Sequence, residues 1–100
     1  MYTWEELKQF ADRCTRCPLC RTRTHPVMGR GSLKADVMFI AEAPGRQEDQ
    51  QGIPFVGPAG HMLDELLAAA SLSRDEIYLT NIIKCNPPFN RDPSDEEKYA

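Results

Sequence analysis

Two strand-like segments joined by an amphipathic helical segment constrain the fold of this chain more than any other feature. Residues 36–41 form a nearly continuous apolar run, as expected for a strand in a sheet that is covered on both faces. Residues 77–84 are also strand-like, and residues 60–72 between them have apolar side chains at helical spacing. A strand, a connecting helix and a second strand predict a right-handed parallel βαβ unit and therefore an α/β fold. On the inner face of the helix we expect Met62, Leu63, Leu66, Leu67 and Ala70.

Capping patterns near the two ends of the chain predict two further helices. Thr3 and Glu6 have the spacing of a capping box, and the helix that they begin should run to about residue 13. Ser94 and Glu97 form a second such pattern. Since this last helix would have only about six residues, and two strands leave open sheet edges, we expect the amino-terminal part of a longer protein. A small complete domain with a frayed tail is the alternative.

The composition restricts the class of protein. The chain has ordinary apolar and charged fractions for a globular protein, and no apolar segment approaches the roughly 20 residues of a membrane span. Its first residues lack the order of a signal peptide, so we expect a cytoplasmic protein with no membrane partner. The net charge of −3 does not indicate a nucleic-acid binder, but the basic residues of segment 13–34 predict either a solvated face or a local patch for phosphates. They are Arg13, Arg16, Arg21, Arg23, Arg30 and Lys34.

The cysteines indicate a metal or cluster site. Cys14, Cys17 and Cys20 form a C-x2-C-x2-C pattern within an irregular segment, residues 14–34, and Cys85 follows the second strand. In a cytoplasmic protein such spacing favours ligation over disulfides, and the neighbouring arginines should lower the pKa of the thiols. Four thiolates can bind zinc tetrahedrally or hold an iron–sulfur cluster, and the spacing alone does not distinguish these. A set of unligated buried cysteines is the plainer alternative.

The glycine- and proline-rich segment 41–60 is where we expect the functional site. It begins where the first strand ends, and α/β proteins bind their ligands at the carboxyl ends of strands. We expect most of it to be a loop, and loops of this length are more often functional than idle.

Two long motifs give the chain a family resemblance. The pattern EAPGxxEDxxGxPFVGxAG spans residues 42–60, and NxxKCxPPxNRxP spans residues 81–93. Together with the early cysteine pair, they resemble the family 4 uracil-DNA glycosylases, which are iron–sulfur enzymes of bacteria and archaea. The resemblance implies a three-layer α/β/α sandwich around a four-stranded parallel sheet. Residues 1–100 would form the amino-terminal portion of this single domain, with the cysteine- and arginine-rich loop 14–34 inside it.

The resemblance also implies a 4Fe–4S cluster, with zinc as the alternative. Cys14, Cys17 and Cys85 match three of the family's ligands, and the fourth is expected just beyond Ala100. Cys20 is not a family ligand, although it can act as a substitute in this chain. The family's catalytic histidine belongs to a later motif, so we expect residues 1–100 to be inactive alone.

Base recognition is expected from Asn81 and Phe55. The Asn81 amide can accept from uracil N3–H and donate to O4, whereas cytosine presents the reverse pattern. Phe55 can stack on the flipped base, and loss of such stacking costs about 1–3 kcal/mol. The remaining expected substrate-binding residues are Ala41, Ala43 and Gly45, of which Ala41 stands where the family usually has glycine. As plainer roles, Phe55 can anchor its loop to the core and Asn81 can be a satisfied core amide or a strand-end cap.

Cleavage of the N-glycosidic bond leaves a cation-like sugar, so a carboxylate that orients water is expected. Glu42 is the first choice and Glu48 the second, while Asn90 can position the water or a phosphate. The plainer alternative is that Glu42 and Glu48 are solvated charges on a loop. The expected activity is excision of uracil from single- or double-stranded DNA by a monomer after base flipping. The alternatives are a non-catalytic iron–sulfur or zinc-binding domain of this fold, and a glycosylase for another damaged base.

Overall fold

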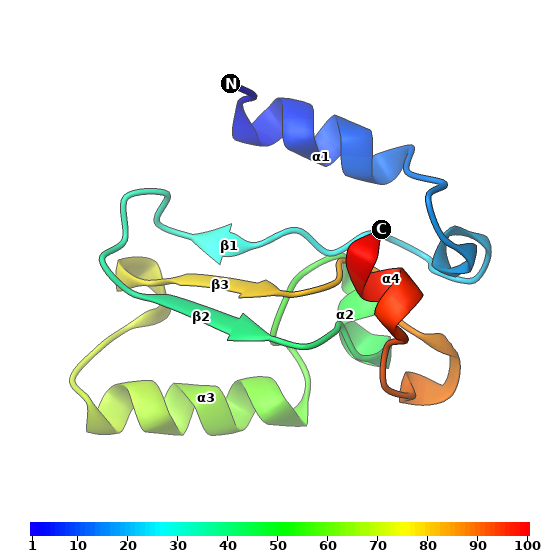
Figure 1. Cartoon of the computed structure of the whole chain (residues 1–100). Coiled ribbons are helices and arrows are strands. Elements are labelled where there is room, and N and C mark those ends of the chain that lie inside the picture. Colours follow the sequence, from blue (N-terminus) through cyan, green and yellow to red (C-terminus); the bar gives the residue numbers. More distant parts are fainter.

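A three-stranded mixed sheet organises the computed structural model, which describes residues 1–100 (Figure 1). The strand order is β1-β3-β2, with β1 at Arg30–Gly31, β2 at Met38–Ala41 and β3 at Tyr78–Asn81. β2 and β3 are parallel, and their register places Ala41 opposite Asn81. The predicted parallel βαβ unit is therefore confirmed, with α3 (Pro58–Ala69) as its connecting helix.

The core lies between the sheet and one face of α3. Leu63 and Leu67 of α3 pack with Ile77 and Leu79, and Phe55 packs against this cluster. The predicted inner face of the helix was too wide, because Met62 and Leu66 are 64% and 63% exposed. The apolar stripe of α3 that meets the sheet is thus one residue wide at each turn.

One face of the sheet is open at β2. The residues of β2 alternate in exposure, and Met38 and Ile40 are 56% and 61% exposed. The prediction of a strand covered on both faces was therefore wrong for residues 1–100, since α3 covers only the face that holds Phe39. The second helical layer of a three-layer sandwich does not extend over β2 in this part of the fold. None of the helices in residues 1–100 is long and apolar enough to cross a bilayer.

The short strand β1 lies inside the segment that was expected to be irregular. It runs antiparallel to β3, so the sheet is mixed where a parallel sheet was predicted. Gly31 makes this pairing possible, because its φ is +122° and a Cβ there would overlap the carbonyl oxygen of Ile77. Helix α1 (Trp4–Asp12) lies beyond this strand, and Trp4 Nε1 donates to the Tyr78 hydroxyl at 3.2 Å (Figure 1).

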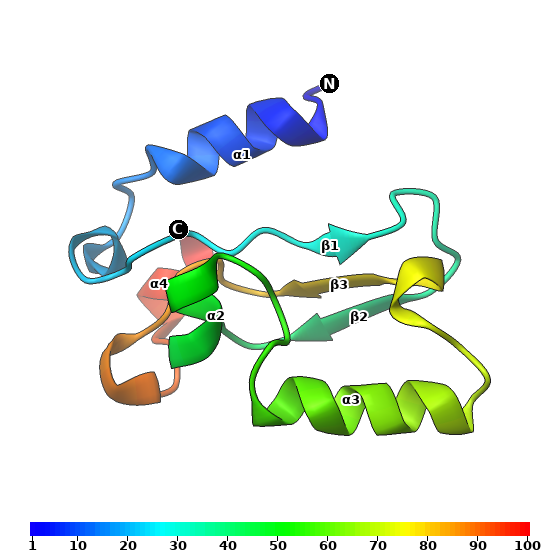
Figure 2. The same ribbon diagram turned by 180° about the vertical axis from the view of Figure 1, so that it is seen from behind.

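Short helices gather beyond the carboxyl ends of β2 and β3 (Figures 1 and 2). They are α2 (Arg46–Gln51) and α4 (Asp95–Tyr99). The segment 41–60 is therefore not a continuous loop, since α2 occupies its middle. The remaining short turns are 3₁₀ helices at η1 (Pro18–Arg21), η2 (Arg74–Glu76) and η3 (Pro88–Asn90).

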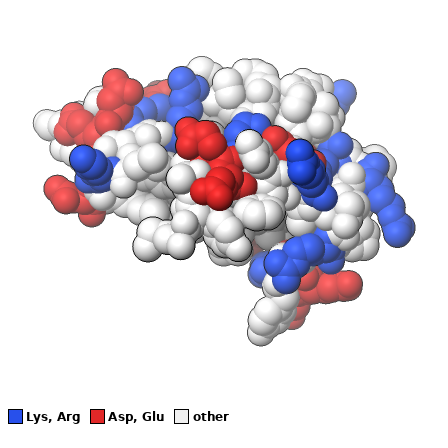
Figure 3. Space-filling view, turned by 90° about the horizontal axis from the view of Figure 1, so that it is seen from above, with Lys and Arg blue, Asp and Glu red and all other residues white.

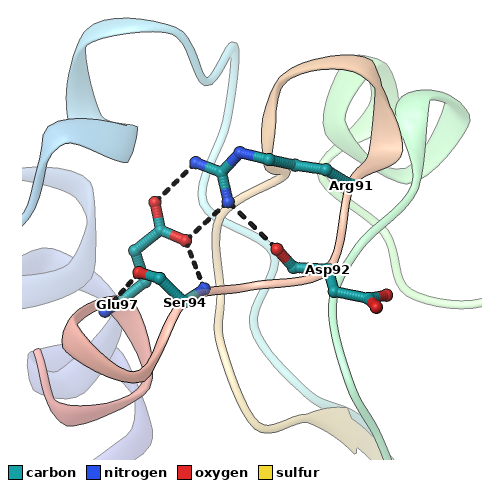
Figure 4. Close-up of polar contacts among 4 residues, drawn as sticks. All are labelled: Arg91, Asp92, Ser94 and Glu97. Atoms are coloured by element: carbon teal, nitrogen blue, oxygen red, sulfur yellow. Dashed lines mark hydrogen bonds and ion pairs between the residues drawn. The ribbon is translucent and has the colours of Figure 1, made fainter.

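An ion pair holds the start of α4 (Figure 4). The predicted capping box is present, since Ser94 Oγ accepts from the Glu97 backbone N–H and Glu97 accepts from that of Ser94. Arg91 donates to both carboxylate oxygens of Glu97, at 2.8 and 2.7 Å. The Arg91 hydrogen bonds, followed by the Ser94 backbone bond, lower the pKa of Glu97 to about 2. Arg91 is thus paired with a carboxylate.

This pair makes the stability of the fold sensitive to acid. Because the folded-state pKa lies below the ordinary value of 4.5, ionised Glu97 stabilises the fold above pH 4.5 and loses this effect as the pH falls toward 2. We therefore expect Glu97→Gln to lower the melting temperature at pH 7, and the difference from the wild type to vanish near pH 2. Glu96→Gln, on the exposed side of the same helix, is the control. A difference that stayed constant down to pH 2 would contradict this account.

Candidate functional site

A pocket of about 410 Å³ opens at the carboxyl ends of the two parallel strands. Its wall is made by the end of β2, the starts of α2 and α3, the end of β3, and η3. Seven of the eight residues predicted for substrate binding or catalysis line it, and Glu42 does not. The seven are Ala41, Ala43, Gly45, Glu48, Phe55, Asn81 and Asn90.

Asn81 supplies a buried amide without a partner. It is 4% exposed, and its only hydrogen bond to a side chain is made by its backbone oxygen, which accepts from Lys84 Nζ. No fully buried side-chain nitrogen or oxygen of the chain lacks a partner, so the Asn81 amide must reach the pocket space. An amide that reaches this space can bond water there, and a ligand with matching groups would take the place of that water. The role of a satisfied core amide therefore does not describe Asn81.

Phe55 contributes both to the pocket and to the core. It lines the same pocket as Asn81 and packs against the apolar cluster between α3 and the sheet. Its φ is 59°, in the left-handed region that a bulky side chain rarely adopts. Its packing agrees with the predicted loop anchor, and its place in the pocket wall is compatible with the predicted stacking on a base, which stays a prediction.

Glu48 ties the two ends of the pocket loop together. Its carboxylate accepts backbone N–H bonds from Gly45 at 3.0 Å, Val56 at 2.9 Å and Gly57 at 2.7 Å. These bonds join the start of α2 to the segment that enters α3. The geometry therefore gives Glu48 a structural task, and its predicted action on water stays a prediction.

The two other predicted catalytic residues lie in different settings. Glu42 is exposed and outside the pocket. Asn90 lines the pocket with a φ of 55°, and its Oδ1 accepts from Asn86 Nδ2 at 2.9 Å. Asn86 also donates to the Pro44 carbonyl at 2.7 Å and so connects the two loops of the pocket. Sequence reasoning missed Asn86, because the motif leaves this position unspecified and only the fold brings it to Pro44.

Replacement of Glu48 tests its structural task. In Glu48→Gln, one carboxylate oxygen becomes an NH₂ group that faces backbone N–H donors, so we expect a loss of about 1–3 kcal/mol in the free energy of unfolding. Urea unfolding measures this loss. Glu42→Gln is the matched control, since Glu42 is exposed, and it should change the free energy little. Equal small effects in both variants would show that the three N–H bonds do not support the loop.

A second cavity, of about 220 Å³, brings the four cysteines together. Cys14, Cys17, Cys20 and Cys85 all line it, and all are free and half-buried. Ala100, at the end of α4, lines the same cavity. No three His, Cys, Asp or Glu side chains in the chain converge closely enough to hold a single metal ion.

Arg23 connects the two parts of this cysteine cavity. Its guanidinium donates to Cys85 Sγ at 3.1 Å and to the Cys14 carbonyl at 2.9 Å. Burial raises the pKa of the Cys85 thiol, while the Arg23 hydrogen bond and charge act in the opposite direction without overcoming it. The predicted lowering of the thiol pKa by a neighbouring arginine is therefore present at Cys85, but loss of hydration is the larger effect and the net shift is upward.

Charges of both signs are present on the face seen in Figure 3. Lys and Arg lie at both ends and in the middle, and Asp and Glu are interspersed with them at the left, in the centre and at the lower right. This face carries no extended surface of one sign. The local patch for phosphates expected from residues 13–34 stays a prediction.

The fold and the pocket together define a class: an α/β domain that presents a buried amide and an aromatic ring at the carboxyl edge of parallel strands. The chain belongs to the uracil-DNA glycosylase superfamily, whose family model matches residues 28–99. The match confirms the family resemblance that the two motifs predicted, at the level of the superfamily.

Curated relatives make the likeness more specific. The chain is 45% identical to a Type-4 uracil-DNA glycosylase of Thermotoga maritima, covering 100% of the chain and 54% of the relative. It is 52% identical to that of Archaeoglobus fulgidus, covering 84% of the chain and 42% of the relative. It is 44% identical to the Type-4 uracil-DNA glycosylase of Sulfurisphaera tokodaii, covering 100% of the chain and 46% of the relative. The chain thus spans about half the length of the curated relatives that it matches.

Proposed function

We propose that this protein takes part in DNA repair by excising uracil from DNA through hydrolysis of the N-glycosidic bond after base flipping. The observation that carries the proposal is the buried, unpartnered Asn81 amide in one pocket with Phe55. Relatives named Type-4 uracil-DNA glycosylase support it. The substrate is uracil-containing DNA, single- or double-stranded, and the protein acts as a monomer in the cytoplasm. Residues 1–100 are expected to be inactive alone.

Recognition of the base rests on the direction of hydrogen bonds. The Asn81 side-chain oxygen accepts from uracil N3–H and its NH₂ donates to O4. Cytosine would place a donor against the NH₂ and an acceptor against the oxygen, and so leave buried polar groups unpaired. Phe55 stacks on the base and recovers part of the few kcal/mol that flipping costs.

Stabilisation of the uracil anion involves the loop after β2. Pro44 has no N–H, and the Gly45 N–H is engaged by Glu48, so neither is free to donate. The Ala43 N–H has no backbone partner and lies in the pocket wall, which makes it the best donor of this loop toward the uracil oxygen that gains charge.

Asn90 is the residue of this chain best supported for holding the attacking water. It lines the pocket, and Asn86 fixes its side chain. Glu48 is the carboxylate that lines the pocket. It can face the cationic sugar while its hydrogen bonds to backbone N–H groups hold it in place. Glu42 is exposed and outside the pocket, so only the sequence supports it as the carboxylate that orients the water.

Release of free uracil tests the function. The protein expressed from its complete coding sequence should release uracil from single-stranded uracil-containing DNA, and Asn81→Leu should lower kcat/KM by about 10²–10³-fold. Leucine has nearly the shape of asparagine, so the fold should be retained. Gln50→Ala, an exposed amide on α2, is the control and should keep full activity.

The outcome also separates the alternatives. Absence of release by the folded wild-type protein would overturn the enzyme proposal and favour a non-catalytic domain. Release of another deaminated base in preference to uracil would favour the related glycosylase activity.

We further propose a 4Fe–4S cluster in the cysteine cavity, held by Cys14, Cys17, Cys85 and a fourth ligand beyond Ala100, with zinc as the alternative. A tetrahedral zinc ion needs four sulfurs at about 2.3 Å, whereas a cluster binds each thiolate to a different iron and keeps them apart. A cavity lined by four thiols is compatible with either group, and the family resemblance is what favours the cluster. When bound, it would join the loop after α1 to the segment after β3.

Metal analysis and absorbance test this cofactor. Anaerobically purified protein should be brown and contain iron and sulfide, and Cys85→Ser should lose the visible absorbance. Cys20→Ser is the matched control, because it removes a thiol from the same cavity that is not an expected ligand. Colourless protein with stoichiometric zinc would contradict the cluster, and loss of colour in Cys20→Ser would make Cys20 a ligand.

A further inference from the structure

We propose that Arg74 is a positioning residue that holds Phe55 against the pocket, an inference that rests on the proposed function. Arg74 belongs to η2, just before β3, and does not line the pocket of Asn81 and Phe55. Any effect on the reaction must therefore pass through residues that it holds, and Phe55 is the one of these that lines the pocket.

The contacts of Arg74 converge on the segment between Phe55 and α3. One guanidinium nitrogen, Nη2, donates to the Phe55 carbonyl at 2.8 Å and to the Gly60 carbonyl at 2.9 Å. Nε pairs with Asp64 Oδ1 at 2.5 Å, on the next turn of α3. The planar guanidinium of Arg74 thus links the turn that contains Phe55 with the first turns of α3.

Phe55 needs such support because its backbone is strained. A left-handed φ in a bulky residue persists only where the surroundings enforce it. Gly60 allows the close approach, since a Cβ at position 60 would overlap the Phe55 carbonyl oxygen. That approach leaves the Phe55 carbonyl facing the first turn of α3, where Arg74 supplies its hydrogen bond.

The chemistry of the clamp requires arginine. Its rigid fork serves two carbonyl groups with one nitrogen and a carboxylate with another, whereas the ammonium of lysine is a single point on a flexible stem. Arg74→Lys keeps the charge and loses the fork, so it separates geometry from general attraction to DNA.

A double-mutant cycle tests the inference. Single-turnover release of uracil from single-stranded DNA is measured for the wild type, Arg74→Gln, Phe55→Leu and the double variant of the protein from its complete coding sequence. Arg74→Gln should lower the rate roughly 5–100-fold, the range expected from loss of one stacked base. The release rate of the double variant should lie within about twofold of the rate of Phe55→Leu, because the two residues act as one unit. Lys8→Gln, which removes the same charge from an exposed site on α1, should keep the full rate.

The other outcomes are equally decisive. Multiplicative effects in the double variant, or full activity in Arg74→Lys, would overturn the clamp. If the wild type released no uracil, the proposed function would fail, and hydrogen exchange would still decide the clamp. Exchange over residues 55–60 should speed up in Arg74→Gln and not in Lys8→Gln. If Arg74→Gln did not fold, Asp64→Asn should show a partial loss of rate or faster exchange over the same residues, and wild-type behaviour would count against the proposal.

Discussion

The parallel pairing of β2 and β3 is the constraint on which the rest of the structure depends. Their register puts Ala41 opposite Asn81, so the two chain segments leave the sheet at the same edge and at the same level. Every loop that builds the pocket or the cysteine cavity starts from that edge or returns to it. Without the pairing, a buried amide at Asn81 would have no pocket to face and would only destabilise the core.

Charged and amide side chains hold the pocket loops by bonding to backbone groups. Glu48 collects three N–H groups, Arg74 two carbonyls, and Asn86 bridges Pro44 to Asn90. Short loops that carry strained residues have few backbone partners of their own, so such side chains replace the ladder of a helix or sheet. The pocket is therefore preorganised by residues that need not touch the substrate, which is how a modest core of 100 residues can support a polar site.

Sequence reasoning predicted the connected elements and failed where contacts between distant segments decide. Capping boxes at Thr3 and Ser94 and the βαβ unit were correct, because each depends on neighbours within a few residues or on a strong periodicity. The strand β1 was missed, because it has only two residues, and their pairing with Tyr78 and Leu79 depends on a close approach at Gly31 that no local pattern reports. The exposure of Met62 was also missed, since periodicity reports an apolar stripe and not how much of it the sheet covers.

From the amino-acid sequence alone came the α/β class, the membership suggested by the two motifs, and most of the residues that the structure brings to one pocket, because residue type and spacing carry that information. Only the tertiary structure decided how those residues divide their work. It separated Glu42 from the pocket, engaged Glu48 with backbone donors, and left the Asn81 amide free. Hydrogen-bond partners and burial depend on which segments meet in space, and no local pattern specifies that.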